Sequence, residues 1–130
     1  VLVEGDDLNE PIADAVRAIL DGHIVLTRDL AMQNHYPAID ILSSISRVMD
    51  DITSLKHRDY AYRFKETMAT YRKVEDLINI GAYVAGSNPK IDYALEIIER
   101  VNSYLRQDIE DYTSYEEAVL QLEEIFGDKR

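Results

Sequence analysis

The stretch Tyr36–Asp51, "YPAIDILSSISRVMDD", holds the side chains best suited to chemistry. It combines an aromatic-proline pair, several aliphatic residues and a single cation, Arg47, which follows three serines. By residue type alone, Tyr36 would pack the segment beside Pro37, and Arg47 would form an exposed ion pair with a following aspartate worth at most about 1 kcal/mol. A loop that only connected two elements would not require this combination, so the segment is a candidate functional site.

Other residues offer little chemistry. The carboxylates in "VEGDDLNEP" are adjacent, as in solvated turns, and do not indicate a catalytic pair. The chain has no cysteine, and His23, His35 and His57 lack the spacing of metal ligands, so we assign no metal. The 130 residues contain no G-x-x-x-x-G-K-[ST] loop, no G-x-G-x-x-G turn and no supported Ser-His-Asp arrangement. They therefore do not contain a complete active site.

Composition limits the class of protein. The 130 residues are 46% hydrophobic and 30% charged, which predicts one globular domain with one core. The net charge of −11 argues against binding to nucleic acid, because phosphate contacts need clustered cations. We expect a cytoplasmic protein, since no apolar run is long enough to span a bilayer and the start does not resemble a signal peptide. Seven carboxylates and no cations lie between Asp108 and Glu124, which predicts a solvated face or a docking surface.

Hydrophobic spacing predicts the elements that must position the candidate segment. Residues 1–4 fit a short strand, a helix should begin near Pro11 and end before Asp21–Gly22, and "HIVLT" at 23–27 fits a second strand. Strand, helix and strand in this order indicate a βαβ-like unit with parallel strands. Because the chain opens on Val1 in an apolar run, we expect it to be part of a longer protein that supplies the rest of that sheet.

The remaining sequence predicts helices only. One apolar stripe extends from Tyr60 to Ile78, a second helix should start at Asn88-Pro89, and a third at a capping box of Thr113 and Glu116. The predicted fold is therefore mainly α: a remnant strand-helix-strand of an α/β domain, followed by a C-terminal helical bundle.

Two motifs carry a family resemblance. "VLVEGDDLNEPIADAVRAILDGHIVLTRDLA" and "HYPAIDILSSISRVM" resemble the rotary-ATPase-like family, and within it the type III secretion ATPases, with "LINIGAYVAGSNPKID" closer to the flagellar branch. The resemblance divides the chain into residues 1–34 as the end of the nucleotide-binding domain, 35–52 as a junction and 53–130 as the C-terminal helical domain. It also implies a full-length protein about three times longer, with its P-loop and catalytic glutamate before Val1, so these 130 residues alone are predicted to be inactive.

The resemblance assigns roles within the junction. It implies that Tyr36 stacks on the adenine of bound ATP, since an aromatic face can cover a flat base. It implies that Arg47 is an arginine finger, which stabilises charge on the γ-phosphate of ATP in a neighbouring subunit and contributes roughly 10³ to 10⁵ in rate. The same segment would thus contact adenine in its own site and phosphate in the next one.

The resemblance extends, less directly, to the helical part. Ile109 and Tyr115 correspond to residues that close the adenine pocket, although Ile109 replaces an aromatic residue, and core packing is the alternative for both. The loop Gly81–Pro89 corresponds to an acidic lever that contacts a rotating shaft in the synthase relatives. Here the loop is neutral, so Tyr83 and Val84 would provide an apolar contact, unless Tyr83 folds back onto the bundle.

The function implied is that of a homohexameric ATPase that energises flagellar type III protein export, using ATP with Mg²⁺ in the full-length protein. The expected partners are a central coiled-coil stalk protein, a peripheral-stalk regulator and complexes of export chaperones with their substrates. The protein would lie at the cytoplasmic face of the export apparatus, with only peripheral membrane association. The alternatives are a virulence type III secretion ATPase and a non-catalytic helical adaptor that binds a coiled-coil stalk or chaperones.

Overall fold

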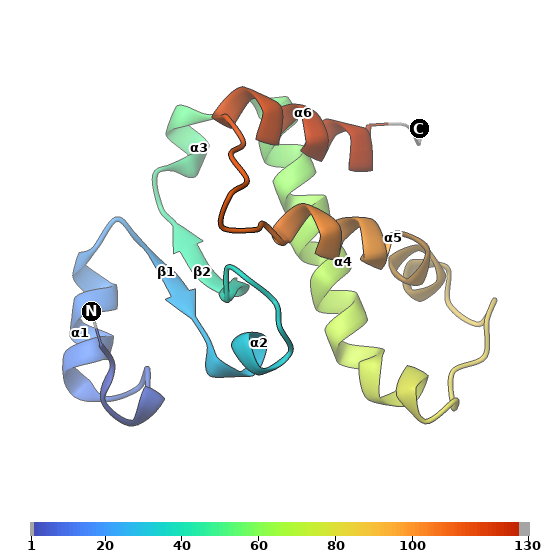
Figure 1. The fold of residues 1–130 in the computed structure, drawn as a ribbon, viewed down its shortest axis with the longest axis horizontal. Helices are drawn as coiled ribbons and strands as arrows, with labels where there is room; N and C mark the ends of the chain where they lie inside the picture. The colour runs from blue at the N-terminus through green and yellow to red at the C-terminus, as the bar shows by residue number, and fades with distance from the viewer. Residues whose placement is uncertain (1, 128–130) are drawn as a thin grey trace.

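A two-stranded sheet and a group of three long helices make up most of the structure, a computed structural model that describes residues 2–127 (Figure 1). Figure 1 shows α1 and the sheet on one side, and α4, α5 and α6 on the other. The elements in chain order are η1 Glu4–Asp6, α1 Pro11–Ile19, β1 Gly22–Leu26, α2 Arg28–Met32, β2 Ile39–Ser46, α3 Met49–Ile52, α4 Leu55–Asn79, α5 Pro89–Leu105 and α6 Tyr115–Phe126.

The two strands pair in antiparallel fashion, with Gly22 opposite Ser46 and Leu26 opposite Ile39. Gly22 allows a close approach, because a Cβ atom at this position would lie 2.6 Å from the carbonyl oxygen of Ile45. The register is irregular between His23 and Val25. The junction therefore contains a strand of its own, which the sequence did not predict.

The expected parallel βαβ unit is wrong. Leu2 and Val3 are not in a strand, a 3-10 turn follows at Glu4–Asp6, and Val1 lies outside the described residues. The strand at 22–26 instead pairs with the later strand β2. Local apolar character suggested the first strand, whereas the actual pairing depends on residues about twenty positions further along the chain, which propensity cannot reveal.

Capping explains where the helices begin. Pro89 occupies the first turn of α5, where a missing N–H costs nothing, and the Asn88 side chain accepts a hydrogen bond from the Lys90 backbone N–H, as the sequence predicted. The capping box of α6 lies one residue later than expected, because Ser114 and Glu117, rather than Thr113 and Glu116, bond to each other's backbone.

The core lies between α4, α5 and α6. Phe64 packs edge-on against Phe126 and Tyr104, with ring centroids 6.0 and 5.7 Å apart, and Val101 is fully buried between the helices. Strand β2 joins this core through Ile41. The mainly α fold class is thus confirmed, and β2 is the strand that contacts the bundle.

None of the described helices is both long and apolar enough to cross a bilayer. No group of three or more acidic or histidine side chains within residues 2–127 is arranged to hold a metal ion.

Candidate functional site at the strand–helix junction

Asp40, the second residue of β2, is the most connected side chain of the junction. Only 8% of its surface is exposed. One carboxylate oxygen, Oδ1, accepts from the backbone N–H of Leu42 at 3.0 Å, and Oδ2 accepts from the Ser43 hydroxyl at 2.7 Å. Arg72 of α4 donates to the same carboxylate, with Nη2 3.2 Å from Oδ1 and Nη1 3.5 Å from Oδ2. The strand is therefore held to the bundle by a charged pair.

These contacts determine the charge state of Asp40. Burial opposes ionisation and acts to raise the pKa, but the hydrogen bonds from Ser43 and Arg72, the charge of Arg72 and the Leu42 N–H outweigh it and leave the pKa of Asp40 below its ordinary value. The carboxylate is thus ionised at neutral pH and compensated.

Ser44 extends this connection to the neighbouring strand. Its hydroxyl donates to the backbone carbonyl of Asp40 at 2.6 Å and accepts from the backbone N–H of Val25 at 2.9 Å. The contact falls where the strand register is irregular, so a side chain replaces a ladder hydrogen bond there. Strands β1 and β2 and helix α4 are therefore linked through one polar cluster.

Tyr36 lies just before β2, and its peptide bond to Pro37 is cis. The residue is 52% exposed, so part of it remains accessible to a ligand. The backbone carbonyl of Tyr36 accepts from the Gln107 N–H at 2.9 Å. This bond ties the start of the α5–α6 loop to the junction, and Ile109, two residues further along that loop, is fully exposed.

Arg47 follows the last residue of β2 and is exposed. Its backbone N–H donates to the backbone carbonyl of Asp21 at 2.8 Å. Its guanidinium donates only a long, 3.3 Å hydrogen bond to the Arg17 carbonyl. Within the described residues it forms no ion pair with Asp50 or Asp51, and Asp50 instead accepts from the Tyr62 hydroxyl at 2.8 Å. The ion-pair alternative for Arg47 is therefore wrong.

Tyr115 lies apart from Tyr36, at the first turn of α6. Its hydroxyl is 3.3 Å from His57 Nδ1 of α4, with ring centroids 6.1 Å apart, and 64% of the residue is exposed. Since Ile109 is also exposed, core packing is wrong for both residues. The structure connects the loop of Ile109 to Tyr36, whereas Tyr115 of α6 contacts His57 near the start of α4.

The loop between α4 and α5 is ordered by Asp92. Its Oδ1 accepts from the Tyr83 hydroxyl at 2.9 Å, and both of its oxygens accept from the Gly86 N–H at 3.1 Å. Gly86 has φ 86°, in the left-handed region. Val84 on the same loop is 70% exposed, and Ile80 at the end of α4 is 75% exposed. Tyr83 is thus tied to the bundle by its hydroxyl, while Val84 is free to meet a partner.

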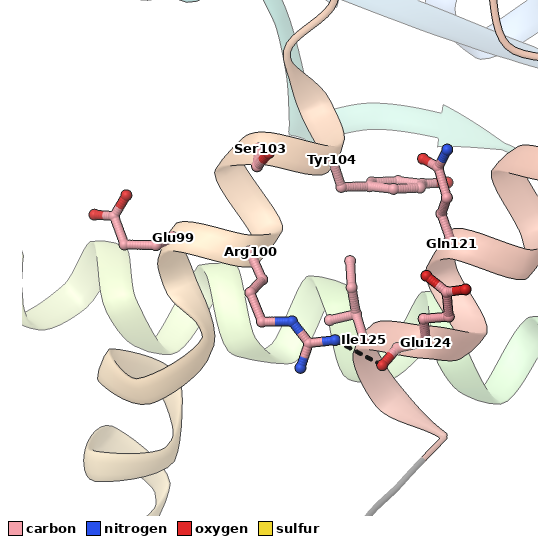
Figure 2. A pocket seen from close by; sticks show the side chains of 7 residues that line it. All are labelled: Glu99, Arg100, Ser103, Tyr104, Gln121, Glu124 and Ile125. Atoms are coloured by element: carbon pink, nitrogen blue, oxygen red, sulfur yellow. Dashed lines mark hydrogen bonds between the residues drawn. The ribbon is translucent and has the colours of Figure 1, made fainter.

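The described residues form two hollows, and only the smaller one includes residues of the junction. A groove of about 410 Å³ lies between α5 and α6, where Figure 2 shows Arg100 reaching the end of α6; its guanidinium donates to the Glu124 carbonyl at 2.7 Å. A smaller cavity of about 160 Å³ lies between the junction and helices α4 and α5 and is lined by His35, Asp40 and Arg72. Burial and the nearby Arg106 lower the pKa of His35, so its imidazole is neutral at pH 7.

Sequence reasoning missed Asp40, Arg72 and His35. An aspartate three residues before a serine is a local signal for a side-chain hydrogen bond, and it is present here as Asp40 and Ser43. No comparable signal connects Asp40 to Arg72, which lies 32 residues away.

Sequence models of two protein families match the chain. Residues 53–124 match the family described as T3SS EscN ATPase C-terminal domain, and residues 1–46 match the nucleotide-binding domain of the ATP synthase alpha/beta family.

Curated relatives give the same picture. A flagellum-specific ATP synthase of Bacillus subtilis is 48% identical over 99% of this chain and 30% of its own length. A type 3 secretion system ATPase of Pseudomonas syringae is 44% identical over 94% of this chain and 27% of its own length. The chain thus spans less than a third of either relative.

Solved structures agree with the fold. The assembled ATPase EscN of the enteropathogenic E. coli type III secretion system superposes with a TM-score of 0.92 at 46% identity, covering 96% of this chain and 30% of that one. EscN in complex with its central stalk EscO superposes with a TM-score of 0.83 at 45% identity, covering 88% of this chain and 28% of that one.

Proposed function

The chain belongs to the family of type III secretion ATPases, whose C-terminal domain it matches over residues 53–124, and from this premise we propose that it is part of an ATPase that energises flagellar type III protein export. The proposed active form is a homohexamer in the cytoplasm, in which each subunit hydrolyses ATP with Mg²⁺. Similarity to flagellar and type 3 secretion ATPases alike supports an export ATPase, and the assignment to the flagellar branch rests on the resemblance of "LINIGAYVAGSNPKID". A virulence secretion ATPase would use the same residues in the same roles.

The observation that carries this proposal is the placement of Tyr36 and Arg47 at opposite ends of β2. An extended strand of eight residues spans about 26 Å. The two side chains are thus held at opposite ends of one strand, an arrangement that suits contacts with two different nucleotides. Both are exposed, and neither has a strong partner within the described residues that would hold it away from a ligand. The separation supports an adenine contact in one site and a phosphate contact in the next.

The adenine site would form around Tyr36. The ring of Tyr36 would cover one face of the base, and the exposed Ile109 would border it from the loop that the Gln107–Tyr36 hydrogen bond ties to the junction. Stacking removes apolar area from water and does not depend on hydrogen-bonding groups of the base. Tyr115, which contacts His57, would border this site only if the loop moved, and we give it the weaker role.

Arg47 would act on the phosphates of a neighbouring subunit. In phosphoryl transfer, negative charge is spread over the three equatorial oxygens of the γ-phosphoryl group, and a planar guanidinium stabilises that charge in the transition state. The guanidinium of Arg47 makes only one long hydrogen bond, to a backbone carbonyl, which it can readily give up to bind a phosphate. The described residues fit no Mg²⁺ site of their own, and the chain has no phosphate-cradling loop, so 130 residues alone would not hydrolyse ATP.

The partners would bind at the other end of the helical part. EscN is described in complex with a central stalk. We extend that partner to this chain and place the contact at the α4–α5 loop, through Val84 and the apolar ring edge of Tyr83, with a peripheral regulator and chaperone–substrate complexes binding elsewhere. The contact would depend little on salt, because few charges lie on the loop.

The test of the proposal is the Arg47→Ala variant of the full-length protein. Turnover should fall by about 100-fold or more while nucleotide affinity changes less than about threefold, because the finger acts mainly in the transition state. Arg47→Lys should restore little of the turnover, since a lysine ammonium cannot reproduce the planar, multiple hydrogen bonds of a guanidinium.

The matched control is Arg28→Ala, which removes another exposed arginine, paired with Asp6. It should leave turnover within about twofold of the unaltered protein, as for other surface changes. Near-normal turnover of Arg47→Ala would refute the proposed role.

A further inference from the structure

Strand β2 and helix α4 are joined by one charged contact. Arg72 lies on α4 and donates two hydrogen bonds to Asp40 of β2, at 3.2 and 3.5 Å. Among the described residues, this is the only ion pair between the first 51 residues and the helices α4, α5 and α6. Two other polar links join these parts without involving β2 itself. The Tyr62 hydroxyl of α4 donates to Asp50 of α3 at 2.8 Å, and the Gln107 N–H of the α5–α6 loop donates to the Tyr36 carbonyl.

Arg72 lies near one end of α4, and Asp40 lies in the strand that leads to Arg47. Arg72 is seven residues from the end of α4, so about 10 Å of helix separates it from the α4–α5 loop. Asp40 is the second residue of the strand that ends immediately before Arg47. A continuous helix and an extended strand are stiff, so the pair connects the loop at one end with Arg47 at the other.

The chemistry of the pair resists small shifts of the helix. Asp40 is buried and its carboxylate is also engaged by Leu42 and Ser43, so its position in the strand is fixed. The guanidinium of Arg72 is about half exposed and bonds to both oxygens, a geometry that tolerates little rotation. Leaving the carboxylate unpaired would be costly, since its other contacts are to groups of the same strand. A displacement of α4 would therefore move β2 with it.

We propose that Asp40 and Arg72 are positioning residues that couple the α4–α5 loop to Arg47, so that a partner bound at the loop changes the placement of Arg47 and thereby the rate of ATP hydrolysis. This inference rests on the proposed function, because it requires that Arg47 acts on nucleotide and that a partner binds at the loop. Neither Asp40 nor Arg72 touches substrate.

The experiment measures turnover of the full-length protein with and without a coiled-coil stalk protein. In Arg72→Gln, the ratio of stimulated to unstimulated turnover should fall to about 1, and Asp40→Asn should give the same result. In the double variant the ratio should be no lower than in either single variant, because the two changes remove one interaction. Arg72→Lys keeps the positive charge but loses the planar guanidinium that bonds to both carboxylate oxygens, so it should retain less than half of the stimulation.

Glu66→Gln is the matched control, since it removes an exposed ion pair of the same helix, with Lys90 of α5 at 2.9 Å. It should retain the stimulation ratio of the unaltered protein. Coupling is supported if Arg72→Gln loses the stimulation of turnover while its affinity for the stalk protein is unchanged and its melting temperature stays within a few degrees of that of the unaltered protein. If Asp40→Asn does not fold, the surface-lying Arg72→Gln still decides the question.

Stimulation preserved in Arg72→Gln and Arg72→Lys would overturn the inference. The proposed function fails separately, when Arg47→Ala keeps its turnover. A protein in which Arg47→Ala is inactive and Arg72→Gln is fully stimulated would retain the proposed function and refute only the coupling.

Discussion

At the scale of single residues, the side chains that flank β2 are proposed to bind nucleotide, whereas Asp40 within β2 anchors the strand to α4. Tyr36 and Arg47 flank the strand and are exposed, whereas Asp40 inside it is buried and fully engaged. A buried carboxylate is stable only when it is paired, and Arg72 and Ser43 meet that requirement. The flanking residues need no such partner because water solvates them until a ligand arrives.

The acid stability of the chain should depend on Asp40. Its pKa is lowered in the folded state, so its ionised form contributes stability above the unfolded-state pKa of about 3.9, and this contribution is lost as the pH falls through the lower folded-state value. In Asp40→Asn the free energy of unfolding should be lower by about 1 to 3 kcal/mol at pH 7 and should fall less steeply below pH 4 than in the unaltered chain. Urea denaturation between pH 2 and 7 measures this.

The control for that measurement is Asp76→Asn, which removes an exposed carboxylate of α4. It should leave the acid dependence nearly unchanged. An Asp40→Asn profile parallel to that of the unaltered chain would mean that the ion pair contributes nothing to folding.

Sequence alone identified Tyr36 and Arg47 as unusual residues of the junction, and the family resemblance supplied their predicted roles, which remain predictions. It did not identify Asp40 or Arg72. A single aspartate in an aliphatic run is typical of a strand facing water, and an arginine on a long helix is typical of a solvated face. Only the packing of β2 against α4 brings them together, and that packing has no local signature.

At the scale of elements, the long helices and strand β1 were predicted well, whereas β2 and the pairing of the strands were not. Apolar residues every three or four positions predicted α4, α5 and α6, because each helix buries one face in a shared core. Strand β2 lacked a clear alternating pattern, since Asp40 is buried and Ile45 is half exposed, the reverse of what polarity suggests. Its edge pairing with β1 relies on the Ser44 hydroxyl, which periodicity cannot show.

Variants of the α4–α5 loop should affect stalk binding and protein stability to different extents. Val84→Ser should weaken stimulation by a stalk protein at least several-fold and change the melting temperature by no more than about a degree, because Val84 is 70% exposed. Tyr83→Phe removes the hydroxyl bond to Asp92 and should cost about 1 kcal/mol of stability, with a smaller effect on stimulation.

Ala85→Ser is the control on the same loop. Thermal unfolding and stalk-dependent turnover of the three variants are the measurements. A large loss of stability in Val84→Ser, or unchanged stimulation, would show that the stalk contacts a different part of the helical bundle.

At the scale of the whole molecule, burial is uneven. All the buried hydrophobic residues lie in α4, α5 and α6, while Ile12, Ile19 and Ile24 on α1 and β1 are each more than 70% exposed. An apolar face of this kind usually marks an interface. In the proposed full-length hexamer this face would contact the rest of a nucleotide-binding domain, the family whose model matches residues 1–46. That arrangement would set Arg47 close to a subunit boundary.

The central claim is that Arg47 acts on ATP bound to a neighbouring subunit, and turnover of mixed rings tests it most directly. Full-length Arg47→Ala subunits are combined with subunits whose phosphate-binding loop is disabled, so each kind alone gives an inactive ring. If Arg47 acts across the boundary, mixing equal amounts should restore activity at roughly a quarter of the interfaces, where an intact phosphate loop meets an intact Arg47. If mixed rings stay as inactive as either parent while still assembling, Arg47 serves its own subunit and the account is wrong.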